Sequence, residues 1–266
     1  MRKPIITLLT DFGIKDHYVA SMKGVILNIN PQCNLVDITH EVRPHDIQEG
    51  AFILANAFSF FPRGTIHIAV VDPGVGGLRK PILLVTQNYF WVGPDNGLFS
   101  LVAKRDKVKE VIHLTNKKYF LPNVSTTFHG RDIFAPVAGR LSLGIKPEAL
   151  GEKLDHWVEL DLRKPEIRKQ RLLGEIVFID HFGNLISNID ETMFFQFTKK
   201  RPYVIWAGKR RIDHLRKGYW EGKPGELVAL FGSSGYLEIS MNRGNAQRTL
   251  KVKRGDPLQV DIERKV

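Results

Sequence analysis

The chain has 266 residues, of which 43% are hydrophobic, and it carries a formal net charge of +11 at pH 7. This length and composition allow one or two domains with a buried core and exclude a disordered or fibrous protein. The single cysteine, Cys33, cannot form an intrachain disulfide and has no partner thiols for a zinc cluster. No apolar stretch is long enough for a signal-peptide core or a membrane span, so we expect a soluble, cytoplasmic protein that does not enter a membrane.

The positive charge raises the question of a nucleic-acid partner. The basic residues are spread over both halves of the chain, and the densest runs lie at 199–201 and 209–211. Neither run contains interleaved aromatic residues or a known nucleic-acid motif, which is typical of a solvated surface. We therefore expect no nucleic-acid partner.

The first part of the chain alternates apolar strands with amphipathic helices. The predicted strands occupy residues 5–9, 65–71 and 82–85, which are apolar runs of the kind buried on both faces of a helix-covered sheet. Between them, residues 46–61 place their apolar side chains at helical spacing. This order predicts an α/β domain over residues 1–165, with a largely parallel sheet covered by helices.

Two more helices are predicted in this domain. Apolar residues at helical spacing follow Asp16, a candidate N-cap, and they are Val19, Met22, Ile26 and Ile29. The other helix is predicted over 132–143, with Pro136 in its first turn, where proline is tolerated.

Helical spacing fades after residues 163–171, a basic stretch with Pro165 that is predicted as a linker. Short strands separated by glycine turns follow, at 175–180, 185–189, 203–206, 227–231, 236–240 and 258–262. The sequence therefore predicts a smaller second domain over residues 166–266, with an all-β, barrel-like fold.

Polar residues stand where the predicted strands end. Asp11 and Asp72 each follow an apolar strand, so both are expected at the carboxyl edge of the sheet, where open α/β folds bind ligands. Capping of the next turn is the alternative role of each carboxylate. The glycines after Asp72 lack the spacing of a phosphate-binding or dinucleotide-binding loop and are expected to turn the chain sharply towards Arg79.

His129 lies in a glycine-flanked loop, where a histidine is usually structural. A metal site is an alternative, because several acidic residues and this histidine could act as ligands. They are Asp11, Asp72, Asp95, His129 and Asp132. No paired cysteine or His-x-x-x-His spacing supports it, so we expect neither a metal nor another cofactor.

Five runs together resemble one known family. They lie at residues 10–13, 71–79, 128–132, 180–184 and 233–238, in the order TDFG, VDPGVGGLR, FHGRD, DHFGN and SSGYLE. In this order they resemble the adenosyl-forming S-adenosyl-L-methionine (SAM) hydrolases, also called hydroxide adenosyltransferases, which are relatives of the fluorinases and chlorinases. The resemblance covers nearly the whole chain.

The resemblance implies a catalytic set of Asp72, Arg79 and His129. The halogenases carry other residues at the aspartate and histidine positions, so the implied reaction is attack of water or hydroxide on the ribose 5′ carbon of SAM, releasing adenosine and L-methionine. Asp72 and His129 can each accept a proton from water, whereas Arg79 can only donate hydrogen bonds. The sequence leaves open which of the two takes the proton.

The resemblance also implies the substrate contacts. Asp11 is expected at the ribose hydroxyls, Asp180 at the methionine ammonium, and Phe182 and Tyr219 on the faces of adenine, although such aromatics are more often core residues. The remaining expected contacts are Asn184 at a polar edge, Ser233 and Ser234 at the methionine carboxylate, and Glu238, Met241 and Arg243 nearby. His45 replaces an aromatic residue of the halogenases, and its role stays open.

The resemblance also implies a homotrimer. In it, each site forms between the first domain of one subunit and the second domain of its neighbour. Two other functions stay open at this point. One is a halide-dependent adenosyl transferase that makes 5′-halo-5′-deoxyadenosine. The other is a nucleoside-binding or nucleic-acid-binding protein without turnover.

Overall fold

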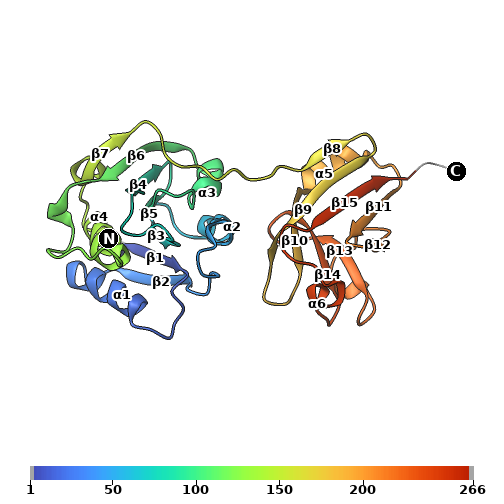
Figure 1. Cartoon of the computed structure of the whole chain (residues 1–266), viewed down its shortest axis with the longest axis horizontal. Helices are drawn as coiled ribbons and strands as arrows, with labels where there is room; N and C mark the ends of the chain where they lie inside the picture. Colours follow the sequence, from blue (N-terminus) through green and yellow to red (C-terminus); the bar gives the residue numbers. More distant parts are fainter. Residues whose placement is uncertain (1–2, 264–266) are drawn as a thin grey trace. The chain divides into compact units, whose positions relative to one another are not determined.

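The computed structural model describes residues 3–263, and its contacts divide the chain into two compact units, residues 1–161 and 162–266 (Figure 1). We call them unit 1 and unit 2 and describe each by itself. Within the described residues, no helix combines the length and apolar character needed to cross a membrane.

Unit 1 is built on a seven-stranded sheet with the strand order β2-β1-β3-β5-β4-β6-β7. The strands are β1 (Ile5–Thr10), β2 (Asn34–Thr39), β3 (Ile66–Val70), β4 (Pro81–Thr86), β5 (Phe90–Pro94), β6 (Val108–Leu114) and β7 (Gly151–Leu154). Strands β2, β1, β3 and β5 pair in parallel, whereas β4, β6 and β7 add antiparallel pairs. The predicted α/β class is confirmed, and the parallel strands β1 and β3 end at one carboxyl edge.

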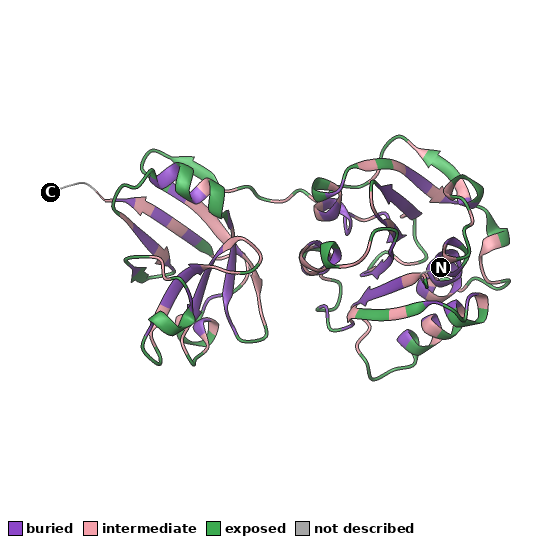
Figure 2. Ribbon diagram, turned by 180° about the vertical axis from the view of Figure 1, so that it is seen from behind, coloured by how far each residue is buried: buried purple, intermediate pink, exposed green. Residues whose placement is uncertain are grey.

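Helices cover both faces of this sheet (Figures 1 and 2). They are α1 (Tyr18–Ile29) and α4 (Ala135–Ser142) on one face, and α2 (Ile47–Ala57) and α3 (Ser100–Arg105) on the other. Side chains alternate along β1, so Leu8 packs with Met22 of α1 while Leu9 packs with Leu54 of α2. The sheet is therefore buried on both sides, as its apolar strands predict.

The helix ends confirm one predicted feature and correct another. Pro136 lies in the first turn of α4, as expected. Asp16 is not the N-cap of α1, because the helix begins after His17 and no side chain caps it. Asp46 does cap α2, since its carboxylate accepts a hydrogen bond from the backbone N–H of Glu49. Short 3₁₀ helices occupy Phe58–Phe60, Lys117–Tyr119 and Pro147–Leu150.

Unit 2 is a second, antiparallel sheet with the path β12-β11-β15-β9-β10-β14-β13, and β8 pairs with β9 beside it. The strands are β8 (Glu166–Arg168), β9 (Arg171–Ile179), β10 (Leu185–Asp190), β11 (Tyr203–Ala207), β12 (Arg210–Ile212), β13 (Leu227–Phe231), β14 (Tyr236–Met241) and β15 (Pro257–Ile262). The terminal strands β12 and β13 are neighbours, so the sheet curls into a nearly closed barrel. The predicted barrel-like fold is confirmed.

Five elements of unit 2 are not predicted by the sequence, and one of them is the short strand β12. The stretch 163–171 contains β8, which pairs with β9 instead of acting only as a linker. Two short helices, α5 (Glu191–Thr198) and α6 (Ala246–Leu250), accompany the strands, and a 3₁₀ turn occupies Tyr219–Glu221. Helices of eight and five residues span too few turns to show a clear apolar period.

Candidate active site

Asp11 and Asp72 meet at the same edge of the unit 1 sheet. Strand β1 ends at Thr10 and strand β3 ends at Val70, and these two residues are partners in the parallel ladder. Asp11 follows Thr10 directly, and Asp72 follows two residues after Val70. Because the strands are parallel, both carboxylates leave the sheet at its carboxyl edge, as predicted.

Asp72, Arg79 and His129 form one hydrogen-bonded group in unit 1. The Nε of Arg79 donates to Oδ1 and Oδ2 of Asp72, each at 3.0 Å, and its Nη2 donates to Oδ2 as well. The same Nη2 lies 2.8 Å from Nδ1 of His129. The Asp72 and Arg79 side chains are only 4% and 9% exposed, which strengthens their ion pair relative to one in water.

Local structure holds this group in place. The Arg79 guanidinium lies over the ring of Phe134, 5.5 Å from its centre. Gly76 has φ +74°, and a Cβ there would collide with the carbonyl oxygen of Thr126, so glycine lets the 71–79 loop pack against the segment that precedes His129. His129 itself introduces a π-helix, Gly130–Phe134, a rare form that is frequent at functional sites.

The contact with Arg79 determines which nitrogen of His129 carries the ring proton. A guanidinium can only donate hydrogen bonds, so Nδ1 of His129 must accept and the proton of the neutral ring must reside on Nε2. Burial and the charge of Arg79 lower the pKa of His129 from 6.5, which favours the neutral ring. His129 therefore presents an N–H donor from Nε2.

Asp11 takes part in a tight turn. Its Oδ2 accepts a hydrogen bond from the backbone N–H of His45 at 2.8 Å, and His45 has an uncommon positive φ of 68°. The turn after β1 is thereby tied to the chain that leads into α2. This contact gives Asp11 a structural role in the turn, and it uses only the Oδ2 atom of the carboxylate.

The five residues considered as metal ligands do not form one cluster, and only Asp72 and His129 are joined, through Arg79. Asp132 accepts hydrogen bonds from Arg131 and from the backbone of Ser125, and Asp95 accepts one from the backbone of Val158. Among residues 3–263, no three His, Cys, Asp or Glu side chains are grouped as metal ligands.

In unit 2, Asp180 shapes the turn between β9 and β10. Its Oδ1 accepts from the backbone N–H groups of Phe182 and Asn184, and its Oδ2 accepts from Nδ2 of Asn184. The turn leaves Phe182 70% exposed, whereas Asn184 is buried. An exposed phenylalanine held by a rigid turn is not a core residue and offers a flat surface to a ligand.

Glu238 is buried on β14 and binds two hydroxyl groups. Tyr219 donates to its Oε1 at 2.8 Å, and Ser240 donates to the same oxygen at 2.6 Å. Burial, followed by the hydrogen bond to Glu238, raises the pKa of the Tyr219 phenol. Tyr219 is thus held as a neutral phenol, with its ring 43% exposed.

The predicted substrate residues of unit 2 lie at two ends of one strand pair. Leu185, next to Asn184, pairs with Ile239, whereas Asp190 pairs with Tyr236, next to the turn that holds Ser233 and Ser234. These two pairings are five residues apart on β10, where the register shifts, and three residues apart on β14, which corresponds to about 10–17 Å along the strands. Met241 ends β14 at the Asn184 end and Arg243 follows it, so one ligand would need an extended shape to reach both groups.

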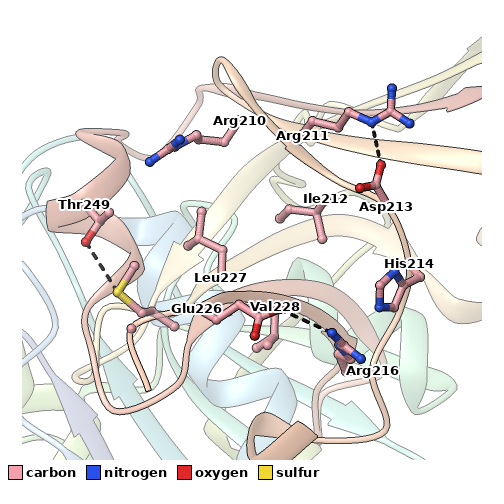
Figure 3. Close-up of a pocket in the computed structure, with 12 residues that line it drawn as sticks. Arg210, Arg211, Ile212, Asp213, His214, Arg216, Glu226, Leu227, Val228 and Thr249 are labelled. Atoms are coloured by element: carbon pink, nitrogen blue, oxygen red, sulfur yellow. Dashed lines mark hydrogen bonds and ion pairs between the residues drawn. The ribbon is translucent and has the colours of Figure 1, made fainter. Parts of the chain in front are cut away.

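A groove of about 330 Å³ in unit 2 shares only Met241 with the predicted substrate residues. Figure 3 shows its basic rim, formed by β12, the following chain and the start of β13. Arg211 pairs with Asp213 and Glu263, and Arg216 pairs with Glu226. Because these acidic partners neutralise most of its charge, the groove has little attraction for an anionic ligand.

The structure adds residues that sequence reasoning missed. Phe134 supports Arg79, Ser240 binds Glu238, and Asn245 lies against Gly183, where any side chain would collide with it. The Phe134 and Asn245 contacts join residues far apart in the chain, so no local spacing could reveal them, whereas Glu238 and Ser240 lie on the same face of β14 two residues apart.

Comparison with known proteins agrees with this fold. The family model for the SAM hydroxide adenosyltransferase N-terminal domain matches residues 6–151, and the model for the C-terminal domain matches residues 174–259. The fold and the two matched domains define an adenosyltransferase-type protein with an α/β domain followed by a barrel-like β domain. The chain belongs to the SAM hydroxide adenosyltransferase family.

Named relatives and a solved structure are similar over nearly the full length. A protein of Methanocaldococcus jannaschii named (R)-S-adenosyl-L-methionine hydrolase is 38% identical, covering 96% of this chain and 95% of its own. A Nocardia brasiliensis protein named fluorinase is 27% identical, covering 98% of each. The crystal structure of an uncharacterized conserved protein from Thermotoga maritima has a TM-score of 0.91 and 38% identity, covering 96% of this chain and 99% of that one.

Proposed function

We propose that this protein hydrolyses SAM to adenosine and L-methionine. The single observation that carries the proposal is the Asp72–Arg79–His129 group, in which a buried carboxylate and an N–H donor flank a cation. Relatives at 35–38% identity are named (R)-S-adenosyl-L-methionine hydrolase, and the relatives named fluorinase are more distant, at 24–29%. The same names support the R epimer of the sulfonium as the substrate.

The reaction forms a bond between the oxygen of water and C5′ of the ribose while the C5′–S bond breaks. The electron pair of that bond stays on sulfur, and methionine leaves as a neutral thioether that needs no proton. The attacking water carries a proton that becomes acidic only as the new C–O bond forms. The site therefore has to align the water and accept one proton, and no general acid is required.

We assign the proton to Asp72. Both nitrogens of His129 are occupied in the neutral ring, because Nδ1 accepts from Arg79 and Nε2 carries the proton. The Asp72 oxygens retain lone pairs besides those that bind Arg79. In this scheme Asp72 accepts the proton of water and passes it to solvent, while His129 Nε2–H orients the water.

The residues of unit 2 supply the proposed substrate contacts. Phe182 and Tyr219 offer exposed rings for adenine, and Asn184 offers a polar edge beside Phe182. Ser233 and Ser234, about one strand length away, suit the methionine carboxylate of an extended SAM molecule. Met241, Arg243, Glu238 and Asp180 complete the set, and Asp11 of unit 1 is assigned to the ribose hydroxyls.

We further propose a homotrimer in which the catalytic domain, residues 1–165, and the substrate-binding domain, residues 166–266, of neighbouring subunits share each substrate. The support is the resemblance to trimeric family members. The test mixes two inactive proteins, Asp72→Asn and the double variant Asn184→Ala with Ser233→Ala, after mild dissociation. Shared sites restore part of the activity, because some sites then combine two intact halves. Mixed oligomers, proven by mass spectrometry, that stay inactive would contradict sharing.

The experiment for the proposed activity incubates the metal-free protein with SAM and follows adenosine and methionine by chromatography. Both products should appear in equal amounts, and the Asp72→Asn protein is the matched control. Absence of both products at high enzyme concentration would refute the hydrolase. A 5′-halo nucleoside formed with chloride or fluoride would favour the halide transferase, although the Asp72 carboxylate would repel a halide ion.

A further inference from the structure

The turn after β1 is attached to the next strand by a buried histidine. Asp11, the proposed ribose-binding residue, lies in this turn. The turn is flanked by Thr10, which is fully buried, and by Phe12 and Gly13. His40 follows β2, and its ring is 4% exposed. It contacts the turn on both sides of Asp11.

On one side the contact runs through the ring. Nδ1 of His40 lies 2.8 Å from Oγ1 of Thr10, and this hydroxyl oxygen accepts a hydrogen bond from the backbone N–H of Phe12 at 3.2 Å. On the other side the contact is to the backbone, because the N–H of Gly13 donates to the carbonyl oxygen of His40 at 2.7 Å. Residues before and after Asp11 are therefore held by the same histidine.

The far side of the ring lies close to a carboxylate without meeting the geometry of a hydrogen bond. Nε2 of His40 lies 3.0 Å from Oδ1 of Asp37, and Oδ2 of Asp37 accepts from Nζ of Lys23 at 2.6 Å. One arrangement of protons serves every partner. Nε2–H of His40 faces the carboxylate, Nδ1 accepts the Thr10 hydroxyl proton, and the Thr10 oxygen accepts from Phe12.

From this geometry we propose that His40 is a positioning residue for Asp11 in the reaction, a role that rests on the proposed hydrolase function. His40 fixes the direction in which the Asp11 carboxylate leaves the sheet. Its loss weakens binding of the ribose and leaves the water-activating group of Asp72, Arg79 and His129 in place.

A matched control lies on the same strand. Thr7 of β1 is 2.7 Å from Nδ1 of His67 on β3, so the strand carries a second buried Thr–His pair. The His67 ring stacks on Trp91 at 4.4 Å between ring centres. Thr7 lies three residues before Thr10, the residue that precedes the Asp11 turn. Loss of this pair should affect stability without touching the ribose contact.

The experiment compares His40→Leu with His67→Leu. For His40→Leu we expect the KM for SAM and the Kd for adenosine, measured by calorimetry, to rise by about 10- to 100-fold, with kcat within about 3-fold of wild type. His40→Asn, which can still bind the Thr10 hydroxyl, should recover part of the affinity. His67→Leu should lower the melting temperature and leave both KM and Kd unchanged.

A double-mutant cycle separates positioning from general loosening of the fold. In an Asp11→Ala background, His40→Leu should have little further effect on adenosine affinity, because the residue it positions is gone. Unchanged KM and Kd in folded His40→Leu, or full additivity with Asp11→Ala, would overturn the proposal. If His40→Leu does not fold, Thr10→Val breaks the same link and takes its place. Wild-type protein that binds adenosine without hydrolysing SAM would contradict the hydrolase function instead.

Discussion

Arg79 donates a hydrogen bond from Nη2 to Nδ1 of His129 across 2.8 Å, while its Nε and Nη2 bind the carboxylate of Asp72. One guanidinium therefore sets both the tautomer of the histidine and the orientation of the carboxylate. Arginine suits this task because its planar fork presents several donors in fixed directions and stays charged at all relevant pH values. The proposed roles follow from this contact: Asp72 accepts the proton of water, and His129 donates a hydrogen bond to the water.

Replacing Asp72 by Asn should lower kcat by about 10²- to 10⁴-fold, which is the usual contribution of a general base. The amide keeps the size of the side chain and cannot take a proton. Adenosine affinity should stay close to wild type, because Asp72 is assigned to the water and not to the nucleoside. Rate measurements at saturating SAM, with calorimetry of adenosine, check both expectations. Turnover near the wild-type rate would show that the proton goes elsewhere.

The acid limb of the pH–rate profile should lie below pH 6.5. Protonated His129 cannot accept from Arg79, and burial together with the Arg79 charge lowers its pKa from 6.5. In Arg79→Gln the cation is absent, so the pKa of His129 should rise towards 6.5. NMR titration of the imidazole measures this pKa without requiring turnover. Lys80→Gln, which removes the neighbouring cation, is the control, and an equal shift in both variants would contradict the role given to Arg79.

Gly76→Ala should damage catalysis as well as stability. A Cβ at Gly76 meets the carbonyl of Thr126, so the 71–79 loop must move away from the His129 segment. Gly64 is the matched control, because it has a similar φ of +83° and no atom within 4 Å of an added Cβ. Both variants should lose about 1–2 kcal/mol of unfolding free energy from backbone strain, and Gly76→Ala should lose more because its Cβ collides with the Thr126 carbonyl. Only Gly76→Ala should lower kcat, by about 10-fold or more, and equal kcat values would contradict the packing argument.

His67 should make the protein less stable in acid. Burial lowers its pKa from 6.5 in the unfolded chain to about 3 in the fold, so the unfolded state binds a proton more readily. Its contribution to stability is complete above pH 6.5 and declines as the pH falls towards 3, by about 1.4 kcal/mol per pH unit. Urea unfolding between pH 4 and pH 8 measures the slope. The His67→Phe protein should have a shallower slope, and identical slopes would show that His67 does not cause the acid sensitivity.

Much of the fold follows from local pattern. The apolar runs of β1 and β3 and the alternating strands of unit 2 are visible in the sequence because burial dictates them residue by residue. The carboxyl edge that joins Asp11 to Asp72 follows from the same pattern, since parallel strands end together.

Other features depend on contacts that no local pattern encodes. The π-helix after His129 and the direction of the Asp180 carboxylate, which binds its own turn, arise from tertiary packing and specific hydrogen bonds. The false N-cap at Asp16 shows the same limit, because α1 is held by its buried face and does not need a capping side chain. The catalytic roles of Asp72, Arg79 and His129 are implied by the resemblance to the SAM hydrolases. The hydrogen bonds that join the three side chains are visible only in the structure.

The central claim is that a water molecule attacks C5′ of SAM, and the source of the 5′ oxygen tests it most directly. The protein should be incubated with SAM in water enriched in ¹⁸O, and the adenosine analysed by mass spectrometry. The account predicts one heavy oxygen at the 5′ position of every adenosine formed and none in the methionine. Adenosine without label at C5′ would contradict attack by water at that carbon.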